Sequence, residues 1–242
     1  MTVSVEEPSA LRRWTGALFT AAALTFGTCA TILSSTFDWP DILREEASVV
    51  IPAFIDGGAS LVWTWFATGW TYAILLVPVL LLPKALGLSF DSAVRVATVV
   101  GATSVAFSLI GFLRWVFVVP ALAREYDTGD ATTRAAIDAA WLAQHQFGGS
   151  LLGEHLGQVG AVAWSSTISI IILRSNILPR WLGWIGLLTS AIYLSNQGDI
   201  LAVAVPGFPI IPAAGFTGST SWGLRIAALG ICVARAPRRL ST

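Results

Sequence analysis

Long apolar stretches separated by short polar segments dominate the sequence. A helix needs about 20 mostly apolar residues to cross a lipid bilayer, and several stretches reach that length. The pattern therefore predicts a bundle of about six transmembrane helices. Their expected bounds are residues 14–36, 57–82, 92–119, 150–173, 181–204 and 218–235.

Basic residues at the ends of these stretches set the expected orientation. They precede the first helix, flank the loops after the second and fourth helices, and follow the last helix. With six spans, all four places fall on one side of the membrane, which the positive-inside rule assigns to the cytoplasm. We therefore expect a multi-pass protein of the bacterial plasma membrane with both termini in the cytoplasm. The residues are Arg12, Arg13, Lys84, Arg95, Arg174, Arg180, Arg235, Arg238 and Arg239.

Two connections on the opposite, outer side are long, and we expect each to carry an interfacial helix. They span residues 37–56 and 121–149. The second connection resumes as a helix from about Ala131, which places His145 on a face at the mouth of the bundle. The pair Gly148-Gly149 is expected to break this helix before the fourth span.

Composition agrees with a membrane bundle. Hydrophobic residues make up 55% of the chain and charged residues 12%, whereas a soluble domain has about 25% charged residues. We therefore predict an all-α fold that forms a single transmembrane domain over residues 1–242, with essentially no soluble part. The formal net charge of zero gives no electrostatic reason to expect nucleic-acid binding, and no cofactor or metal is expected.

Two charges within the apolar stretches are the most informative residues. Arg114 lies six residues before Pro120, and Glu154 lies four residues after Ser150. At 1.5 Å per residue they lie about 9 Å and about 6 Å inward from the outer ends of neighbouring antiparallel helices. An unpaired charge is costly in hydrocarbon, so we expect a direct ion pair between Arg114 and Glu154.

The helix that carries Glu154 also has a pattern of small and polar residues. Gly153 and Gly157 permit another helix to approach closely. Gln158 follows Glu154 by one turn, and the two form part of a polar stripe. His155 projects about 100° away from Glu154 and is expected to face another partner.

Polar side chains gather in the outer halves of the other helices too. This convergence predicts a polar pocket that opens to the outside or to the outer leaflet. A structural role is the alternative, in which the ion pair only locks two helices together and the other polar residues are solvated or packed. The candidate catalytic residues are Glu154, His155, Arg114, Asp199 and Asp56, and the candidate substrate-binding residues are Gln158, Trp63, Trp115, Trp164, Asn196 and His145.

Three segments resemble a bacterial membrane family known as domain of unknown function 4386. They are Arg114-Trp115 followed by Val118-Val119-Pro120, then Gly153-Glu154-His155-Leu156-Gly157, and finally residues 178–186, Leu-Pro-Arg-Trp-Leu-Gly-Trp-Ile-Gly. The resemblance implies an architecture of about six helices. It implies no activity, so the function has to be argued from the residues.

The first functional hypothesis is an intramembrane enzyme that acts on a hydrophobic small molecule dissolved in the membrane lipid. Glu154 would be the acid or base, tuned by Arg114 and His155, with Asp199 or Asp56 as a second carboxylate. Small membrane-bound terpene cyclases are an analogy, because the 11 Trp residues could stabilise cationic intermediates through their rings. One alternative is a protein that binds or transports a small molecule, or whose transport is coupled to protons. The other is a non-catalytic membrane subunit.

Overall fold

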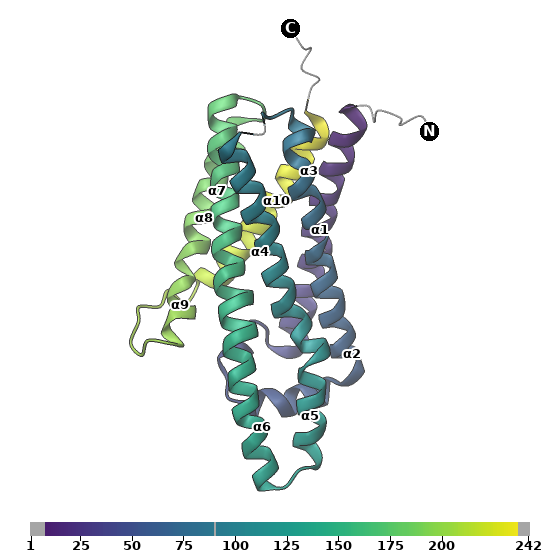
Figure 1. Cartoon of the computed structure of the whole chain (residues 1–242), viewed down its shortest axis with the longest axis vertical. Coiled ribbons are helices and arrows are strands. Elements are labelled where there is room, and N and C mark those ends of the chain that lie inside the picture. Colours follow the sequence, from purple (N-terminus) through teal and green to yellow (C-terminus); the bar gives the residue numbers. More distant parts are fainter. Residues whose placement is uncertain (1–7, 90, 237–242) are drawn as a thin grey trace. The chain divides into compact units, whose positions relative to one another are not determined.

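The computed structural model describes residues 8–89 and 91–236, and every regular element in these ranges is helical (Figure 1). Arg238 and Arg239, which support the expected orientation, lie outside the described residues. In chain order the elements are α1 (Pro8–Phe37), η1 (Asp41–Arg44), α2 (Ala47–Ala73), α3 (Leu76–Leu86), α4 (Ser92–Phe117), α5 (Val119–Thr128), α6 (Ala131–Gln144), η2 (His145–Leu156), α7 (Gly157–Ser175), α8 (Arg180–Ser195), α9 (Gln197–Ala202) and α10 (Ala214–Arg235).

Four helical runs are long and apolar enough to cross a membrane. They are Ser9–Phe37, Ala47–Leu86, Ser92–Thr128 and Ala131–Ser175. This finding confirms an all-helical membrane bundle, because each such run forms its backbone hydrogen bonds within the helix and exposes apolar side chains to lipid. The helices α8 and α10 occupy the fifth and sixth apolar stretches. The total of six spans and the orientation of the termini stay predictions.

Several helix boundaries differ from the sequence prediction. The second apolar helix begins at Ala47, and the expected start near residue 57 coincides with a kink at Gly58, whose φ is 54°. Glycine adopts this conformation without steric cost. The prediction that Gly148-Gly149 breaks a helix is wrong, because η2 is a π-helix that joins α6 directly to α7. Wide π turns are rare and occur frequently at functional sites.

The turn between α5 and α6 agrees with the prediction. The helix α6 begins at Ala131, and the two helices lie side by side as a hairpin (Figure 1). The Asp130 side chain caps α6 by accepting a hydrogen bond from the backbone N–H of Thr133 at 2.8 Å. These hydrogen bonds from Thr133 favour the carboxylate and lower the pKa of Asp130.

The contacts divide the chain into two compact units. Among the described residues, unit 1 contains residues 8–24, 74–89, 91–105 and 158–236, and unit 2 contains residues 25–73 and 106–157.

Unit 2 is held together by buried aromatic rings. Trp65 and Trp115 stack with their ring centroids 4.9 Å apart and their planes at 6°. Phe37 lies edge-on to both Trp residues, and Phe54 contacts Phe37 and Trp115. These rings are almost fully buried, so burial of their large apolar area is a principal source of stability in this unit.

Unit 1 contains two close helix contacts. The helices α8 and α10 pack along each other. A Cβ atom on Gly16 of α1 would lie 2.4 Å from the carbonyl oxygen of Gly230 in α10, so these two backbones touch only because both positions lack a side chain. Small residues serve the same purpose in many membrane helix pairs.

Candidate functional site

Glu154 forms an ion pair with a residue that is not among the candidates predicted from the sequence. The Nη2 atom of Arg44, at the end of η1, lies 2.6 Å from Oε2 of Glu154, and the two side chains are 27% and 20% exposed. The expected direct pair between Glu154 and Arg114 is therefore wrong. The other oxygen of Glu154, Oε1, is buried and has no hydrogen-bond partner among the described residues.

Arg114 instead contacts the backbone of η2. Its Nη1 donates to the carbonyl oxygen of His145 at 3.3 Å, and its Nε is buried without a partner in the described chain. A Cβ atom on Gly149 would lie 1.8 Å from Nη1 of Arg114, so glycine at this position makes room for the guanidinium. Arg114 and Glu154 remain close enough for their charges to interact.

His145 completes the group. Its ring stacks on Trp141 with centroids 5.2 Å apart, and the backbone of Leu43 lies within hydrogen-bonding reach. Its Nδ1 is buried, with no partner in the part of the chain that the structure describes. His145 interacts electrostatically with the charges of Arg44, Arg114 and Glu154. We call Arg44, Arg114, His145 and Glu154 the charged cluster.

Further buried polar atoms without partners lie in the same helical run, α6 and η2. They are Oδ1 of Asp138, Nε2 and Oε1 of Gln144, and Oγ of Ser150, none of which has a partner among the described residues. Native proteins leave few buried polar groups unsatisfied, and each exception calls for a physical reason. Their concentration along one helical run makes this run the candidate functional site.

Small residues position this run within unit 2. A Cβ atom on Gly111 of α4 would lie 2.7 Å from the Cα atom of Gly153, and one on Gly157 would lie 2.5 Å from Oγ of Ser108. The predicted close approach of a helix at Gly153 and Gly157 is therefore confirmed. It holds η2 against α4, the helix that carries Arg114.

An aromatic wall connects the charged cluster to the core of unit 2. Trp141 stacks on His145 and lies edge-on to Trp115 at 5.5 Å, and Trp115 stacks on Trp65. Trp63 does not join this wall, because it is 68% exposed and contacts Phe66.

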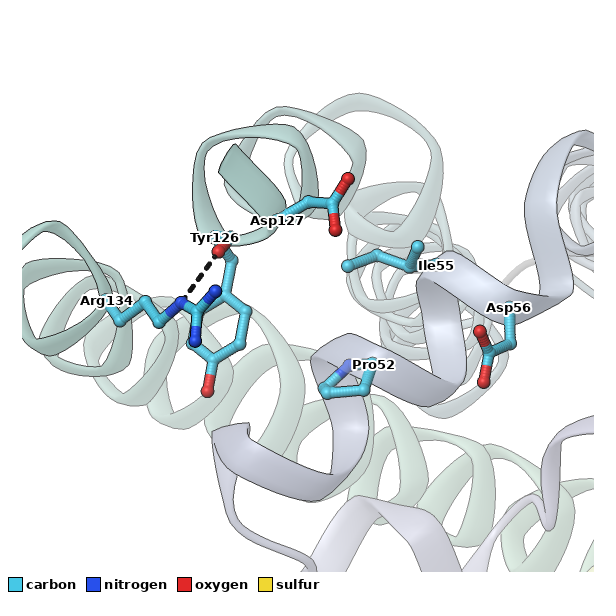
Figure 2. A pocket seen from close by; sticks show the side chains of 6 residues that line it. All are labelled: Pro52, Ile55, Asp56, Tyr126, Asp127 and Arg134. Carbon is cyan, nitrogen blue, oxygen red and sulfur yellow. Dashed lines mark hydrogen bonds between the residues drawn. The ribbon is translucent and has the colours of Figure 1, made fainter. Parts of the chain in front are cut away.

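Asp56 lies in a separate pocket of unit 2, between α2 and the hairpin of α5 and α6. In Figure 2, Ile55 lies between the carboxylates of Asp56 and Asp127. Nε of Arg134 donates to the carbonyl oxygen of Tyr126 at 3.1 Å, and the guanidinium lies 5.5 Å from the centre of the Tyr126 ring. The cavity measures about 240 Å³ and is lined by Pro52, Ile55, Asp56, Tyr126, Asp127 and Arg134.

Two predicted substrate-binding residues are bonded to each other in unit 1. Nε2 of Gln158 donates to the carbonyl oxygen of Tyr193 at 2.5 Å. Its Oε1 accepts from Asn196 at 3.4 Å and from Gln197. Gln158 therefore uses its polar atoms to tie α7 to the end of α8.

The remaining predicted residues are dispersed. Trp164 is buried in unit 1 and stacks on Phe19 at 5.9 Å. Asp199 lies in α9, also in unit 1, and is partly buried. His155 lies next to Glu154 on η2 and is partly buried. Within residues 8–89 and 91–236, no group of three or more His, Cys, Asp or Glu residues is arranged to hold a metal ion.

Comparison with known proteins adds one finding. A family model described as "Domain of unknown function (DUF4386)" matches residues 14–229. No curated protein and no solved structure matches the chain.

Proposed function

The chain belongs to the DUF4386 family, and we propose that it is a membrane enzyme that transfers protons to or from a hydrophobic small molecule. The observation that supports this proposal is the state of Glu154. One of its oxygens is fixed by Arg44, while the other is buried and unpartnered. An oxygen in that state is available to a substrate proton.

The charged cluster contains the groups that general acid–base chemistry needs. Oε1 of Glu154 and Nδ1 of His145 both lack partners among the described residues, so each can accept or donate a proton. Two such groups side by side can add a proton at one point of a substrate and remove one at another. The guanidinium of Arg114 supplies fixed positive charge, which stabilises negative charge that develops on the substrate.

The surroundings favour a hydrophobic substrate. Trp141 stacks on His145, and Trp115 packs edge-on against Trp141. Four helical runs are apolar enough to lie in lipid. A hydrophobic substrate that reached the charged cluster would contact these aromatic faces. Terpene cyclisation is one form of the proposal. In it, the protonated form of Glu154 gives its proton to an alkene or epoxide, the aromatic rings stabilise the resulting cation, and the carboxylate takes a proton back when cyclisation ends.

A binding or transport protein is the second candidate. The charged cluster contains two guanidinium groups and one carboxylate, and such a surplus of positive charge suits an anionic head group. In this version Glu154 releases Arg44 when the ligand binds, and no bond in the ligand changes.

The test uses purified protein in lipid nanodiscs with polyprenyl alcohols and epoxides as probes. We expect the wild type to form a product that Glu154→Gln abolishes. Glu125→Gln removes an exposed carboxylate from α5 and should leave product formation unchanged. Probe that binds to the wild type and is recovered unaltered would favour the binding candidate. Equal product formation by wild type and a folded Glu154→Gln protein would contradict the proposal.

A further inference from the structure

Arg225 is a buried cation in unit 1, outside the charged cluster. It lies in α10 and is only 2% exposed. Its Nη2 donates to Oγ of Ser169 at 2.9 Å. Its Nε and Nη1 are buried, and neither has a partner among the described residues.

No carboxylate of the described chain balances this charge. No carboxylate among the described residues lies within ion-pair distance of Arg225. An arginine cannot lose its proton under ordinary conditions, and its guanidinium carries five N–H donors and no acceptor. A buried charge of this kind is costly unless something of opposite sign compensates it.

The neighbouring polar groups add donors. Ser169 donates to the carbonyl oxygen of Ser165 at 2.7 Å, so its own oxygen is the acceptor for Arg225. Trp222 precedes Arg225 by nearly one helical turn, and its Nε1 is buried without a partner in the described chain. Its indole N–H can only donate. Ser165 also has a buried hydroxyl with no described partner.

The helix α8 closes this region at a glycine. A Cβ atom on Gly186 would lie 2.1 Å from Oγ of Ser169 and 2.8 Å from Nε of Arg225. One turn further along α8, Ser190 presents another buried hydroxyl that lacks a partner among described residues. Buried polar groups on α7, α8 and α10 therefore lie at, or within about one helical turn of, the residues that contact Arg225, and the close approach of α8 leaves little room.

We propose that Arg225 is the centre of an anion-binding site that takes a compact inorganic anion such as chloride. The charge of Arg225 provides the attraction, and the N–H groups of Arg225 and Trp222 provide hydrogen bonds. The tight contact at Gly186 selects for small size. The site is independent of the proton-transfer chemistry proposed for unit 2.

The test measures binding of radioactive chloride to the full-length protein in nanodiscs, together with the melting temperature in chloride and in gluconate. The wild type should bind chloride and melt at a lower temperature in gluconate. Trp222→Phe keeps the ring but loses the N–H, and we expect about tenfold weaker binding, the value of one hydrogen bond to a charged group. Arg225→Met should abolish both effects. Arg134→Met removes an exposed arginine and should leave both effects unchanged.

Two results would overturn the proposal. One is a wild-type protein that binds no chloride and melts at the same temperature in both salts. The other is unchanged chloride binding in Trp222→Phe and in a folded Arg225→Met protein. If Arg225→Met does not fold, the Trp222→Phe comparison decides.

Discussion

Arg44 and Glu154 meet at 2.6 Å although 110 positions separate them in the sequence. The contact ties the short helix η1 to the π-helix η2, and it fixes one oxygen of the carboxylate that we place at the centre of the function. The second oxygen has no partner among the described residues, so in the proposed function this single contact orients Glu154 and leaves that oxygen for a substrate.

The ion pair should contribute modestly to stability. Both side chains are partly exposed, so we expect a coupling of about 1 kcal/mol in a double-mutant cycle of Arg44→Met and Glu154→Gln. Denaturant unfolding in detergent would measure it. The parallel cycle of Arg114→Met and Glu154→Gln should give a smaller coupling. A larger coupling for Arg114 would show that the sequence-based pairing was right.

Gly149 should be intolerant of a side chain. Its Cβ would lie 1.8 Å from Nη1 of Arg114, so Gly149→Ala has to displace a buried guanidinium, at a cost of about 2 kcal/mol or more. The matched control is Gly27→Ala, because nothing lies within 4 Å of a Cβ there. We expect the control to be neutral or slightly stabilising in the same helix-rich context. Equal melting temperatures for the two variants would refute the close contact at Gly149.

The aromatic wall should be a principal source of stability in unit 2. Trp115 is 1% exposed, and Trp115→Ala should lower the free energy of unfolding by about 3–5 kcal/mol. Trp63 is 68% exposed, so Trp63→Ala should change it by less than about 0.5 kcal/mol. Thermal unfolding of the two variants in the same detergent would compare them, and similar losses would contradict the assigned packing.

The Asp130 cap should make α6 sensitive to acid. Hydrogen bonds from Thr133 lower the pKa of Asp130, so its stabilising effect is complete above the unfolded value of about 3.9. That effect is lost as the pH falls through the lower, folded value. NMR titration of the Thr133 amide should report the transition. Asp130→Asn keeps a cap but cannot titrate, so the transition should disappear, and its persistence would assign it to another group.

Much of the fold could be predicted because it depends on local patterns. Apolar length identified the helical runs, the local pattern after residue 121 placed the start of α6 near Ala131, and the spacing of Gly153 and Gly157 indicated a close helix contact. Each of these features needs only residues that are neighbours in the sequence or on one helix.

The partner of Glu154 could not be predicted in the same way. Arg44 lies in a connection whose path is set by tertiary packing, and the sequence places no constraint on what it meets 110 positions later. The π-helix also changes the direction of side chains relative to an α-helix, because its hydrogen bonds span five residues. The similar depths of Arg114 and Glu154 in the membrane therefore predicted that the two residues lie near each other. They did not predict which atoms each residue contacts.

Arg225 is marked by the sequence itself. It is a charged residue in the middle of the last apolar stretch, which by itself marks a functional position in a membrane protein. Its surroundings become visible only when α7, α8 and α10 are placed together, since Ser169, Gly186 and Trp222 are far apart in the sequence.

Proton transfer by Glu154 can be tested without knowing the substrate. Washed membranes that contain the wild type, Glu154→Gln or Glu125→Gln protein are incubated in D₂O, and their lipophilic compounds are compared by high-resolution mass spectrometry. We predict that at least one compound gains carbon-bound deuterium in the wild-type and Glu125→Gln membranes but not in the Glu154→Gln membranes. Identical deuterium patterns in all three, with folded protein present in each, would contradict an acid–base role for Glu154.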